Sequence, residues 1–393
     1  MTTFEEILTD GDHIYDAILK SVAGSKWKTT SQRALLNILP LIFDIADQLS
    51  NRTYECDIDN TFTLTERGRK RHIDTFNVRD RTVRHLLCDN IFTPRVKEKI
   101  IYDNAASVEG RGISHARKRF DVHLHRYFMR HGSNEGYILF GDFTKYYDNI
   151  LHEVAKEQLL ELVNHDDYIE WLLNVIFKTF EVDASNLTDE EYVELYDGVL
   201  NKLLYSKRNK NATRTIPKSI SIGDQLSQCI GIYYPHDIDN YVKIVRSQKY
   251  YGRYMDDWYI ISDSKDELND LLSNIIRISR DLGIHINLQK THITKLSSTY
   301  KYLQIKYSLT PTGRIIKRIN PKRVTAMRRK LKALAVKINE GDIDYSNVEN
   351  TYRSWMGSFY KLMSKIQRAN MIELYEDLFD KQINIVNNKM IFE

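Results

Sequence analysis

Residues 249–262 read KYYGRYMDDWYIIS and place two adjacent carboxylates, Asp256 and Asp257, inside an aromatic and apolar run. The aromatic and β-branched residues on both sides predict a β-hairpin with the two aspartates at its turn. Neighbouring carboxylates repel each other and are costly to bury. A tight turn, where short polar side chains are favourable, is one reason to hold them there. A hard divalent cation such as Mg²⁺, which takes carboxylate oxygens, is the other.

A metal site needs a carboxylate from a second segment, and YILFGDFTKYYDNI, residues 137–150, supplies the best candidate. The apolar run 136–143 predicts a short strand that delivers Asp142 at its end, where a side chain can emerge into a cleft. The alternative is that Asp142 caps the next helix, with Asp148 as an acid of its first turn. The sequence therefore predicts that Asp142 and Asp256 meet.

The composition of the 393 residues is that of a soluble protein with a real core, with 42% apolar and 28% charged residues, enough for two or three units. No run of about 18 apolar residues exists, so no membrane span is expected. The N-terminal stretch is acidic and helical, unlike a signal peptide. Three scattered cysteines form no CxxC pair, which argues against a zinc site or disulfides and favours a cytoplasmic location.

The net charge is only +4, but the cations are clustered. Basic clusters occupy residues 67–72, 115–130 and 317–332, and the acidic stretch 181–197 offsets them in the sum. Each cluster alone is typical of a solvated helix face. Three clusters in one chain favour a polyphosphate partner, and so a nucleic acid.

Hydrophobic periodicity predicts the order of elements along the chain. Segment 181–215, acidic and then basic, has the character of an insertion, and 221–245 begins as a turn and becomes a helix. Helices are expected over 1–50, 79–101 with a break near Pro94, 113–131, 152–164, 265–282 and almost throughout from Pro321 to the end. Strands are expected over 54–78 as a pair around the basic turn RGRKRH, 136–143, 249–262 as a hairpin, 284–287 and 300–309.

Two of these segments together resemble a known family: FGDFTKYYDNI followed by YMDD is similar to motifs A and C of the reverse transcriptases. Other stretches resemble further parts of that family in the right order. They are FNVRDRTVRHLL (76–87) and EGRGISHARKRF (109–120) for the fingers, IGDQLSQ (222–228) for motif B, INLQKTHI (286–293) for motif D, and YKYLQIKYSLTPTGRIIKRI (300–319) for the primer-grip hairpin and the start of the thumb.

Motif B departs from the group II intron enzymes, because Ile222-Gly223-x-x-x-Ser227-Gln228 stands where they carry Gln-Gly-x-x-x-Ser-Pro. This form is similar to diversity-generating retroelement enzymes and to unassigned, often phage-defence, bacterial reverse transcriptases. No maturase-like or endonuclease segment follows the thumb before Glu393. Both features favour those groups over an intron maturase.

The resemblance implies an α+β fold, a right-hand polymerase with fingers, a palm of antiparallel sheet with packed helices, and a C-terminal helical thumb. The expected division is an N-terminal helical segment over 1–55, fingers over 56–135, palm over 136–300 with the insertion at about 181–215, and the primer-grip hairpin and thumb over 301–393.

The resemblance also implies RNA-directed DNA polymerisation, in which a primer 3′-hydroxyl attacks the α-phosphate of a nucleotide. Two Mg²⁺ ions, for which Mn²⁺ can substitute, stabilise the attacking and leaving oxygens. Asp142 and Asp256 are the expected bridging ligands. Asp257 is expected either as a further ligand or as an acid beside the ligands, and the carbonyl of Phe143 as a further ligand. Lys290 is implied as general acid for the pyrophosphate, the alternative being a surface lysine.

Further residues take roles from the same resemblance. Tyr147 would lie under the sugar and exclude a 2′-hydroxyl, which is compatible with core packing. Gln225 would touch the nucleotide or template, and Lys70 and Arg71 would hold the triphosphate. Residues expected at the primer and template are Tyr302, Leu303, Arg328, Arg329 and Lys330, the last three following the duplex backbone without reading its sequence.

The implied partners are an RNA template, expected to be a dedicated noncoding RNA, deoxynucleotides and a DNA product, with room for an accessory protein or a homo-oligomer. Two alternatives stay open: a template-independent or protein-primed polymerase on the same palm, and an inactive RNA-binding scaffold. The sequence does not distinguish phage defence from another retroelement role.

Overall fold

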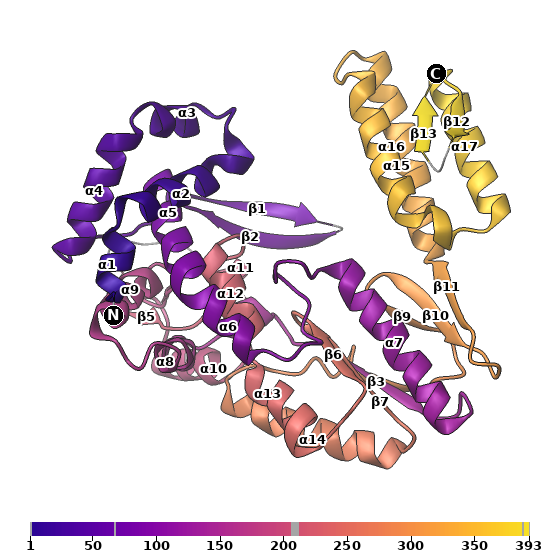
Figure 1. Ribbon diagram of the computed structural model, residues 1–393, viewed down its shortest axis with the longest axis horizontal. Coiled ribbons are helices and arrows are strands. Elements are labelled where there is room, and N and C mark those ends of the chain that lie inside the picture. The colour runs from indigo at the N-terminus through magenta and orange to yellow at the C-terminus, as the bar shows by residue number, and fades with distance from the viewer. Residues whose placement is uncertain (1, 67, 206–211, 387–388, 393) are drawn as a thin grey trace. The chain divides into compact units, whose positions relative to one another are not determined.

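The structure is a computed structural model that describes residues 2–66, 68–205, 212–386 and 389–392 of the 393-residue chain (Figure 1). The chain divides into two compact units, each built from two stretches of sequence. The first unit comprises Met1–Phe120 and Tyr137–Ile293, and the second comprises Asp121–Gly136 and Thr294–Glu393. Helices combined with antiparallel sheets confirm the predicted α+β class.

Short helices, of which the first two are capped by side chains, form the N-terminal part of the first unit, which confirms the prediction for residues 1–50. Thr3 and Glu6 form a capping box at the first helix, and Asp10 caps the second. These helices are α1 (Phe4–Thr9), α2 (Gly11–Val22), α3 (Thr29–Leu36) and α4 (Ile38–Ser50).

The helical stretch predicted over 79–101 is interrupted where expected, at a π-helical turn. Helix α5 (Val78–Leu87) begins after the cap residue Asn77 and continues into a π turn, Cys88–Phe92. Pro94 is the second residue of α6 (Thr93–Lys99), which continues directly from the π turn, since the Thr93 N–H bonds the Cys88 carbonyl. The predicted basic helix 113–131 is α7 (Ile113–His131), which contributes residues to both units.

A four-stranded sheet lies at the centre of the first unit, with strand order β6-β7-β3-β8. Its middle strands are antiparallel, with Leu139 opposite Ile260. Helix α14 (Lys265–Asp281) contributes Leu268 and Ile275 to the same core, and neither is exposed to solvent. The strands are β3 (Tyr137–Gly141), β6 (Tyr251–Tyr254), β7 (Asp257–Ser262) and β8 (His292–Lys295). The predicted strand 136–143 and hairpin 249–262 are therefore confirmed.

The remaining helices of the first unit surround this sheet in the chain order that the periodicity predicts. Their buried faces join one core cluster that includes residues of α8, α9 and α12. They are α8 (His152–Glu161), α9 (Asp167–Lys178), α12 (Gln225–Tyr233) and α13 (His236–Asn240), followed by a π turn, Tyr241–Val245.

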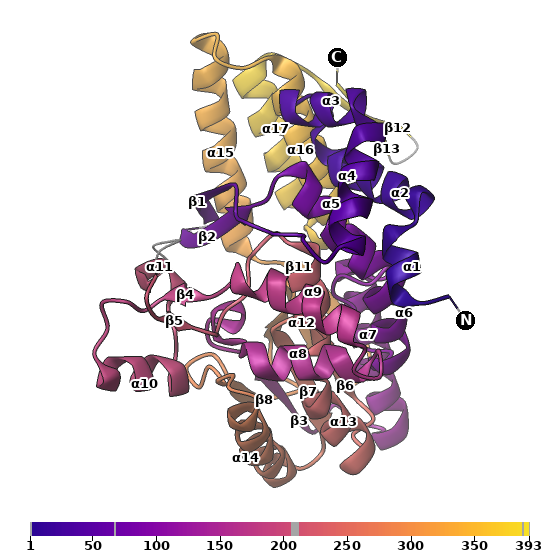
Figure 2. The same ribbon diagram turned by 90° about the vertical axis from the view of Figure 1, so that its left-hand side faces the viewer.

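The insertion predicted at about 181–215 folds around a small core of its own. Val182, Leu200 and Ile216 are buried there, and Tyr192 and Tyr196 stack beside them. Its elements, seen together in Figure 2, are β4 (Val182–Asp183), α10 (Asp189–Asp197), α11 (Lys202–Tyr205) and β5 (Thr215–Ile216), with β4 and β5 antiparallel.

The strand pair predicted over 54–78 is confirmed as the hairpin of β1 (Asn60–Glu66) and β2 (Arg69–Thr75). One detail of the prediction was wrong. The basic residues 69–72 belong to strand β2 and not to the turn, because Arg69 already pairs with Glu66 across the hairpin.

The second unit combines a three-stranded antiparallel sheet, in the order β11-β10-β9, with a helical bundle. Leu331, Val348 and Tyr352 are fully buried in the core of the bundle, and Tyr352 stacks on Tyr375. The elements are β9 (Tyr300–Tyr302), β10 (Ile305–Leu309), β11 (Ile315–Ile319), α15 (Pro321–Asn339), α16 (Tyr345–Phe359), α17 (Lys365–Phe379), β12 (Ile383–Val386) and β13 (Lys389–Phe392).

Three secondary-structure predictions were wrong. Residues 284–287 form no strand, only one bridge between Ile286 and Phe143. The single strand predicted over 300–309 is two strands, because Leu303 and Gln304 adopt positive φ and reverse the chain. The helical tail ends in the antiparallel pair β12 and β13. None of the helices in the described ranges has the length and apolar character to cross a membrane.

Candidate active site

The central sheet places the predicted carboxylates at the same end. Gly141 closes β3 opposite Trp258 of β7, so Asp142 follows β3 where Asp257 precedes Trp258. A Cβ on Gly141 would lie only 2.0 Å from the Trp258 ring, so only glycine allows the two strands to pack here. Asp142 is itself buried, with 7% of its surface exposed.

The turn that carries Asp256 has a strained backbone conformation, which a buried arginine stabilises. Met255 adopts a φ of 58°, which residues with a Cβ other than asparagine and aspartate rarely adopt. The guanidinium of the fully buried Arg253 donates to the Met255 carbonyl (3.2 Å) and to both carboxylate oxygens of Asp239 (2.6 to 3.1 Å). A buried ion pair therefore fixes the turn on which Asp256 stands.

Electrostatics show that Asp142 and Asp256 lie within reach of each other's charge. Burial, and then the charge of Asp142, raise the pKa of Asp256, while Lys290 and Arg71 act in the opposite direction. The Lys290 ammonium donates to Oδ2 of Asp142. The Asn287 side chain reaches the same oxygen at 3.4 Å, and its backbone N–H donates to the Asp142 carbonyl at 2.7 Å.

The donor set at this sheet end suits a hard cation. A carboxylate whose pKa is raised by a neighbouring carboxylate is stabilised when a divalent cation lies between the two. Within the described ranges, no three carboxylate, imidazole or thiol groups are already gathered closely enough to hold an ion. The ammonium of Lys290 supplies the positive charge beside Asp142.

The two further predicted ligands lie on either side of this pair. Phe143 is buried, and its backbone forms the bridge with Ile286. Asp257 is exposed at the start of β7, opposite Tyr254. Both belong to the same sheet end as Asp142.

Tyr147 and Tyr146 have different surroundings. The Tyr147 ring lies against Met255, with its hydroxyl 3.7 Å from the sulfur. Burial and then the charge of Asp256 raise the pKa of Tyr147, so the phenol is close to the carboxylates. Tyr146 points into the core, stacks on Phe143 and donates to the Gly231 carbonyl at 2.8 Å.

Gln225 is the first residue of α12. Its amide donates to Asp89 at 2.6 Å, which ties the start of α12 to the π turn after α5. The residue before it, Asp224, forms a fully buried ion pair with Arg84 at 3.1 Å. The structure therefore gives Gln225 a contact that joins two elements, and its contact with a nucleotide or template stays a prediction.

Lys70 and Arg71 lie next to each other on β2, so their side chains point to opposite faces of the hairpin. Both are exposed, and Arg71 lies 3.4 Å from Glu66. Arg71 is the one whose charge acts on Asp256. The charge of Arg71 thus reaches the carboxylate site, and contact of Lys70 and Arg71 with a triphosphate stays a prediction.

The predicted primer and template residues belong to the second unit. Tyr302 and Leu303 are buried at the turn between β9 and β10. The cations Arg328, Arg329 and Lys330 are all exposed on α15.

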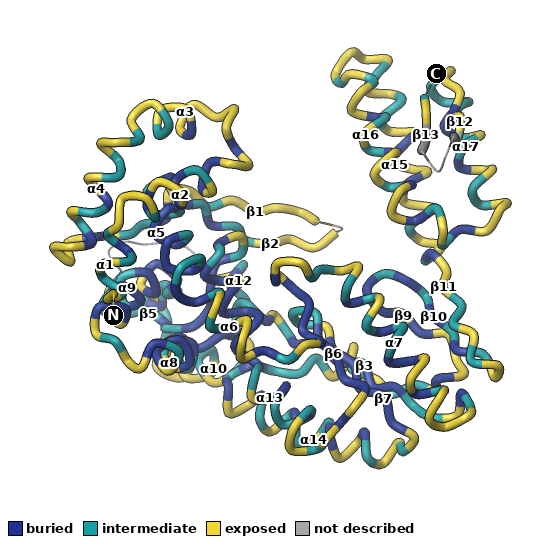
Figure 3. Tube along the Cα trace, in the orientation of Figure 1, coloured by how far each residue is buried: buried dark blue, intermediate teal, exposed yellow. Residues whose placement is uncertain are grey.

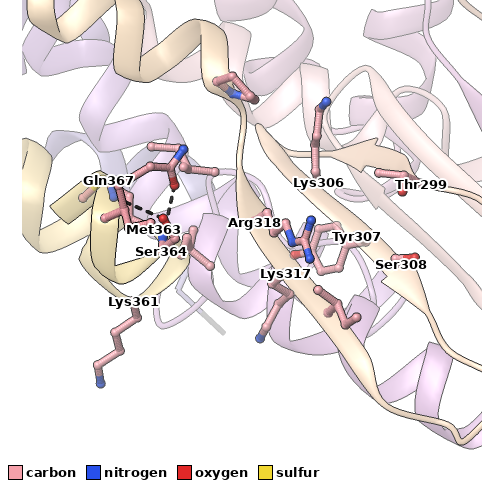
Figure 4. A pocket seen from close by; sticks show the side chains of 15 residues that line it. Thr299, Lys306, Tyr307, Ser308, Lys317, Arg318, Lys361, Met363, Ser364 and Gln367 are labelled. Atoms are coloured by element: carbon pink, nitrogen blue, oxygen red, sulfur yellow. Dashed lines mark hydrogen bonds between the residues drawn. The ribbon is translucent and has the colours of Figure 1, made fainter. Parts of the chain in front are cut away.

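The second unit also contains a cavity of 940 Å³ between the β10–β11 hairpin and the start of α17 (Figure 4). Ile316, Ile319 and Met363 are among its apolar lining residues. Ser364 and Gln367, which cap α17 by exchanging hydrogen bonds, form one wall. Its cations are Lys306, Lys317, Arg318 and Lys361. All lining residues are in the second unit, so the carboxylates of the first take no part in it.

Reasoning from the sequence missed three residues that shape the site. Arg253 and Asp239 support the turn, and the signal was an arginine inside an apolar strand, which needs a buried acid. Gly231 of α12 was also missed. A Cβ there would lie 2.8 Å from the Tyr147 hydroxyl and 3.1 Å from the Met255 sulfur, so this glycine leaves room for both.

Comparison with solved structures found yeast telomerases. Telomerase from Candida albicans in complex with a telomeric RNA fragment has a TM-score of 0.48 at 11% identity, over 81% of this chain and 54% of that one. Telomerase from Candida tropicalis without its C-terminal domain has a TM-score of 0.43 at 11% identity, over 68% and 58%. The apo telomerase of the same yeast has a TM-score of 0.42 at 12% identity, over 66% and 48%. The chain thus spans about half the length of these proteins.

Comparison with curated proteins gave no match. Among protein families, reverse transcriptase (RNA-dependent DNA polymerase) matches residues 65–307, a stretch that begins in the β1–β2 hairpin and includes Asp142, Asp256 and Lys290. Because the match covers more than half of the 393 residues, the chain belongs to the reverse transcriptase (RNA-dependent DNA polymerase) family.

Proposed function

We propose that this chain extends a primer on an RNA template by nucleotidyl transfer and so acts as an RNA-directed DNA polymerase. The observation that supports this most is the meeting of Asp142 and Asp256 at one sheet end, with the Lys290 ammonium on Asp142. In this reaction the primer 3′-oxygen forms a bond to the α-phosphorus, the bond from that phosphorus to pyrophosphate breaks, and the hydroxyl proton is lost.

The carboxylates have the chemistry that the transfer needs. Asp142 and Asp256 would hold two divalent cations, Mg²⁺ with Mn²⁺ as a substitute, with Asp257 and the Phe143 carbonyl beside them. When bound, such cations stabilise the charge on the attacking and leaving oxygens. Lys290 would give a proton to the leaving pyrophosphate; the support is its partly exposed ammonium, which lies at Asp142.

Substrate selection falls to the side chains around the carboxylates. Tyr147, between Met255 and Asp256, would lie under the sugar and exclude a 2′-hydroxyl. Arg71 would hold the triphosphate by paired hydrogen bonds. In this proposal residues 56–135 are the fingers, 136–300 the palm, and 301–393 the primer grip and thumb, with Tyr302 and Leu303 at the primer.

We further propose that the template is a dedicated noncoding RNA and that the enzyme acts in phage defence or a related retroelement system. The support is the Ile222-Gly223-x-x-x-Ser227-Gln228 form of motif B, which resembles those groups. Sequencing of the RNA that copurifies with the chain tests this. Enrichment of one RNA species would support the proposal. Bound RNA with the same composition as total cellular RNA would contradict it.

Primer extension with purified protein tests the activity. With Mg²⁺, deoxynucleotides and an RNA template, the wild type should extend a primer, and Asp256→Asn should retain no more than about 1% of the rate. Asp266→Asn, which changes an acid of the first turn of α14, is the control and should match the wild type. Equal extension without template would indicate a template-independent polymerase. No extension under any condition, with RNA still bound, would indicate a scaffold.

A further inference from the structure

The hairpin of β1 and β2, which carries Arg71, is exposed along most of its length. In the described parts of β1 and β2, Asp74 is the only residue classed as buried (Figure 3). Strands exposed on both faces gain little from hydrophobic burial and do not hold a position by themselves. Whatever fixes Asp74 therefore fixes the direction of the hairpin.

Asp74 is bound by two other segments and by its strand neighbour His72. The ammonium of Lys202, from the insertion, donates to its Oδ2 at 2.9 Å, and the Ser221 hydroxyl donates to the same oxygen at 2.6 Å. The His72 ring lies 3.1 Å from the other oxygen, Oδ1. Lys202 and Ser221 have exposures of 7% and 0%, so this is a buried polar cluster and not a surface ion pair.

The insertion that supplies Lys202 is itself hydrogen-bonded to the short 3₁₀ helix Tyr146–Asn149, which carries Tyr147. The Lys202 backbone N–H lies 3.3 Å from the Asp148 carboxylate. The Asn149 side chain accepts from the Leu200 N–H at 2.8 Å and donates to the Leu200 carbonyl at 3.3 Å. The insertion thus connects the base of the hairpin with the segment directly after the catalytic strand.

We propose that Lys202 is a positioning residue, which holds the hairpin through Asp74 so that Arg71 faces the triphosphate of the incoming nucleotide. This inference rests on the proposed polymerase function and adds a role for the insertion. A buried ion pair contributes little net stability compared with apolar residues, but it favours one arrangement of the segments it joins. A substrate-binding hairpin that is exposed along most of its length needs such a fixed arrangement.

The test compares Lys202→Met with a matched control, Lys218→Met. Lys218 is also fully buried beside the insertion, but its ammonium binds the carbonyls of Tyr196 (2.9 Å) and Gly198 (2.7 Å) at the end of α10. Lys202→Met should raise KM for deoxynucleotides about tenfold or more while kcat changes less than about threefold. Lys218→Met can lower stability but should leave KM as in the wild type.

A second readout does not depend on activity. Hydrogen–deuterium exchange of residues 60–75 in the full chain should become faster in Lys202→Met and stay unchanged in Lys218→Met. If Lys202→Met fails to fold, the double variant Lys202→Met/Asp74→Asn removes both buried charges, and it should show the same rise in KM and exchange.

The outcomes separate this inference from the proposed function. Faster hairpin exchange in an enzyme that never polymerises would uphold the anchor and reject the polymerase. An active enzyme whose KM and hairpin exchange are the same in Lys202→Met and the wild type would reject the anchor alone.

Discussion

Tyr146 and Tyr147 are neighbours in the chain, but their side chains meet different surroundings. Tyr146 is buried and donates to a backbone carbonyl of α12, whereas Tyr147 lies against Met255 within reach of the charge of Asp256. Two adjacent tyrosines thus divide two tasks, core packing and contact with the site. The sequence predicted this division only through the family resemblance, because composition and spacing treat the two residues alike.

The first prediction concerns sugar selection. Tyr147→Ala should raise ribonucleotide incorporation relative to deoxyribonucleotide by about tenfold or more, which is about 1.4 kcal/mol of lost discrimination, because the space under the sugar opens. Tyr147→Phe should keep discrimination, since the ring does the excluding. Competition assays with both nucleotide types measure the ratio.

Tyr146→Ala is the control for that prediction. It removes a buried ring and its hydrogen bond, so it should lower the free energy of unfolding by about 3 kcal/mol or more and leave sugar selection unchanged. A change of sugar selection in this variant and not in Tyr147→Ala would show that the wrong tyrosine has been assigned.

The second prediction concerns pH. His152 is buried against Phe177 and Phe180 at the start of α8, and its ring lies 2.6 Å from the Ser219 carbonyl. Burial lowers the pKa of His152 from 6.5 to about 3. The unfolded chain takes up this proton as pH falls below 6.5, while the folded chain does not. The stability it contributes is therefore full above pH 6.5 and is lost progressively as pH falls toward 3.

At pH 5 the loss from His152 should be about 2 kcal/mol of the free energy of unfolding. His152→Gln keeps a donor for Ser219 but takes up no proton, so its stability should fall less between pH 6.5 and 5. Urea unfolding at the two pH values measures the difference. The exposed His165→Gln should behave as the wild type, and equal losses in wild type and His152→Gln would contradict the assignment.

Helix α12 leaves room for the site because it has a glycine, Gly231, where a side chain would meet Tyr147. Gly231 faces Tyr147 and Met255, and an alanine there normally favours a helix by about 1 kcal/mol. The third prediction is that Gly231→Ala gains no stability, because its Cβ would lie 2.8 Å from the Tyr147 hydroxyl and must displace the ring. We expect kcat/KM to fall about tenfold and sugar selection to weaken.

Gly357→Ala in α16 is the matched control, since a Cβ at that position meets nothing within 4 Å. It should stabilise the protein by about 1 kcal/mol with unchanged activity. Full activity and a similar gain in stability for Gly231→Ala would mean that Tyr147 does not depend on this glycine.

The elements that could be predicted from the sequence are those with a strong local signal. The alternating aromatic run at 249–262 and the capped, periodic helices formed as expected. The turn at Leu303 and Gln304 was missed because neither residue is a usual turn former, although both adopt positive φ. Strands β12 and β13 could have been found, since Asn387-Asn388 between two apolar runs is a hairpin signal.

Contacts between segments far apart in the chain could not be predicted from the sequence. Segment 284–287 looked like a strand, but the hydrogen bonds of Asn287 with Asp142 and of His285 with Thr144 hold it beside the catalytic loop with a single bridge. Gln225 binds Asp89 and Lys202 binds Asp74, and each pair is more than a hundred positions apart in the chain. Periodicity reports which face of an element is buried, and it does not report which partner lies there.

The chain as a whole carries a small net charge of +4, but its cations differ in what they meet. Arg119 and Lys317, from two of the basic clusters, are paired with Asp103 (2.6 Å) and Asp121 (2.8 Å). Paired cations contribute less to the attraction of phosphates than exposed ones, because a neighbouring carboxylate already balances them. Exposed cations on α15 are therefore the better candidates for the phosphate backbone.

The last prediction tests where the nucleic acid lies. Binding of a primer–template duplex should weaken steeply with salt, because each phosphate contact releases counterions and contributes about 0.9 to the slope of log K against log salt concentration. Reversing Arg328, Arg329 and Lys330 together should flatten that slope by about 2 to 3. Reversing the exposed Lys26, Lys28 and Arg33 changes net charge equally and, near the N-terminus, should leave the slope near that of the wild type. Equal flattening by both triple variants would show that net charge alone sets the salt dependence, and an unchanged slope in the α15 variant would place the duplex on another surface.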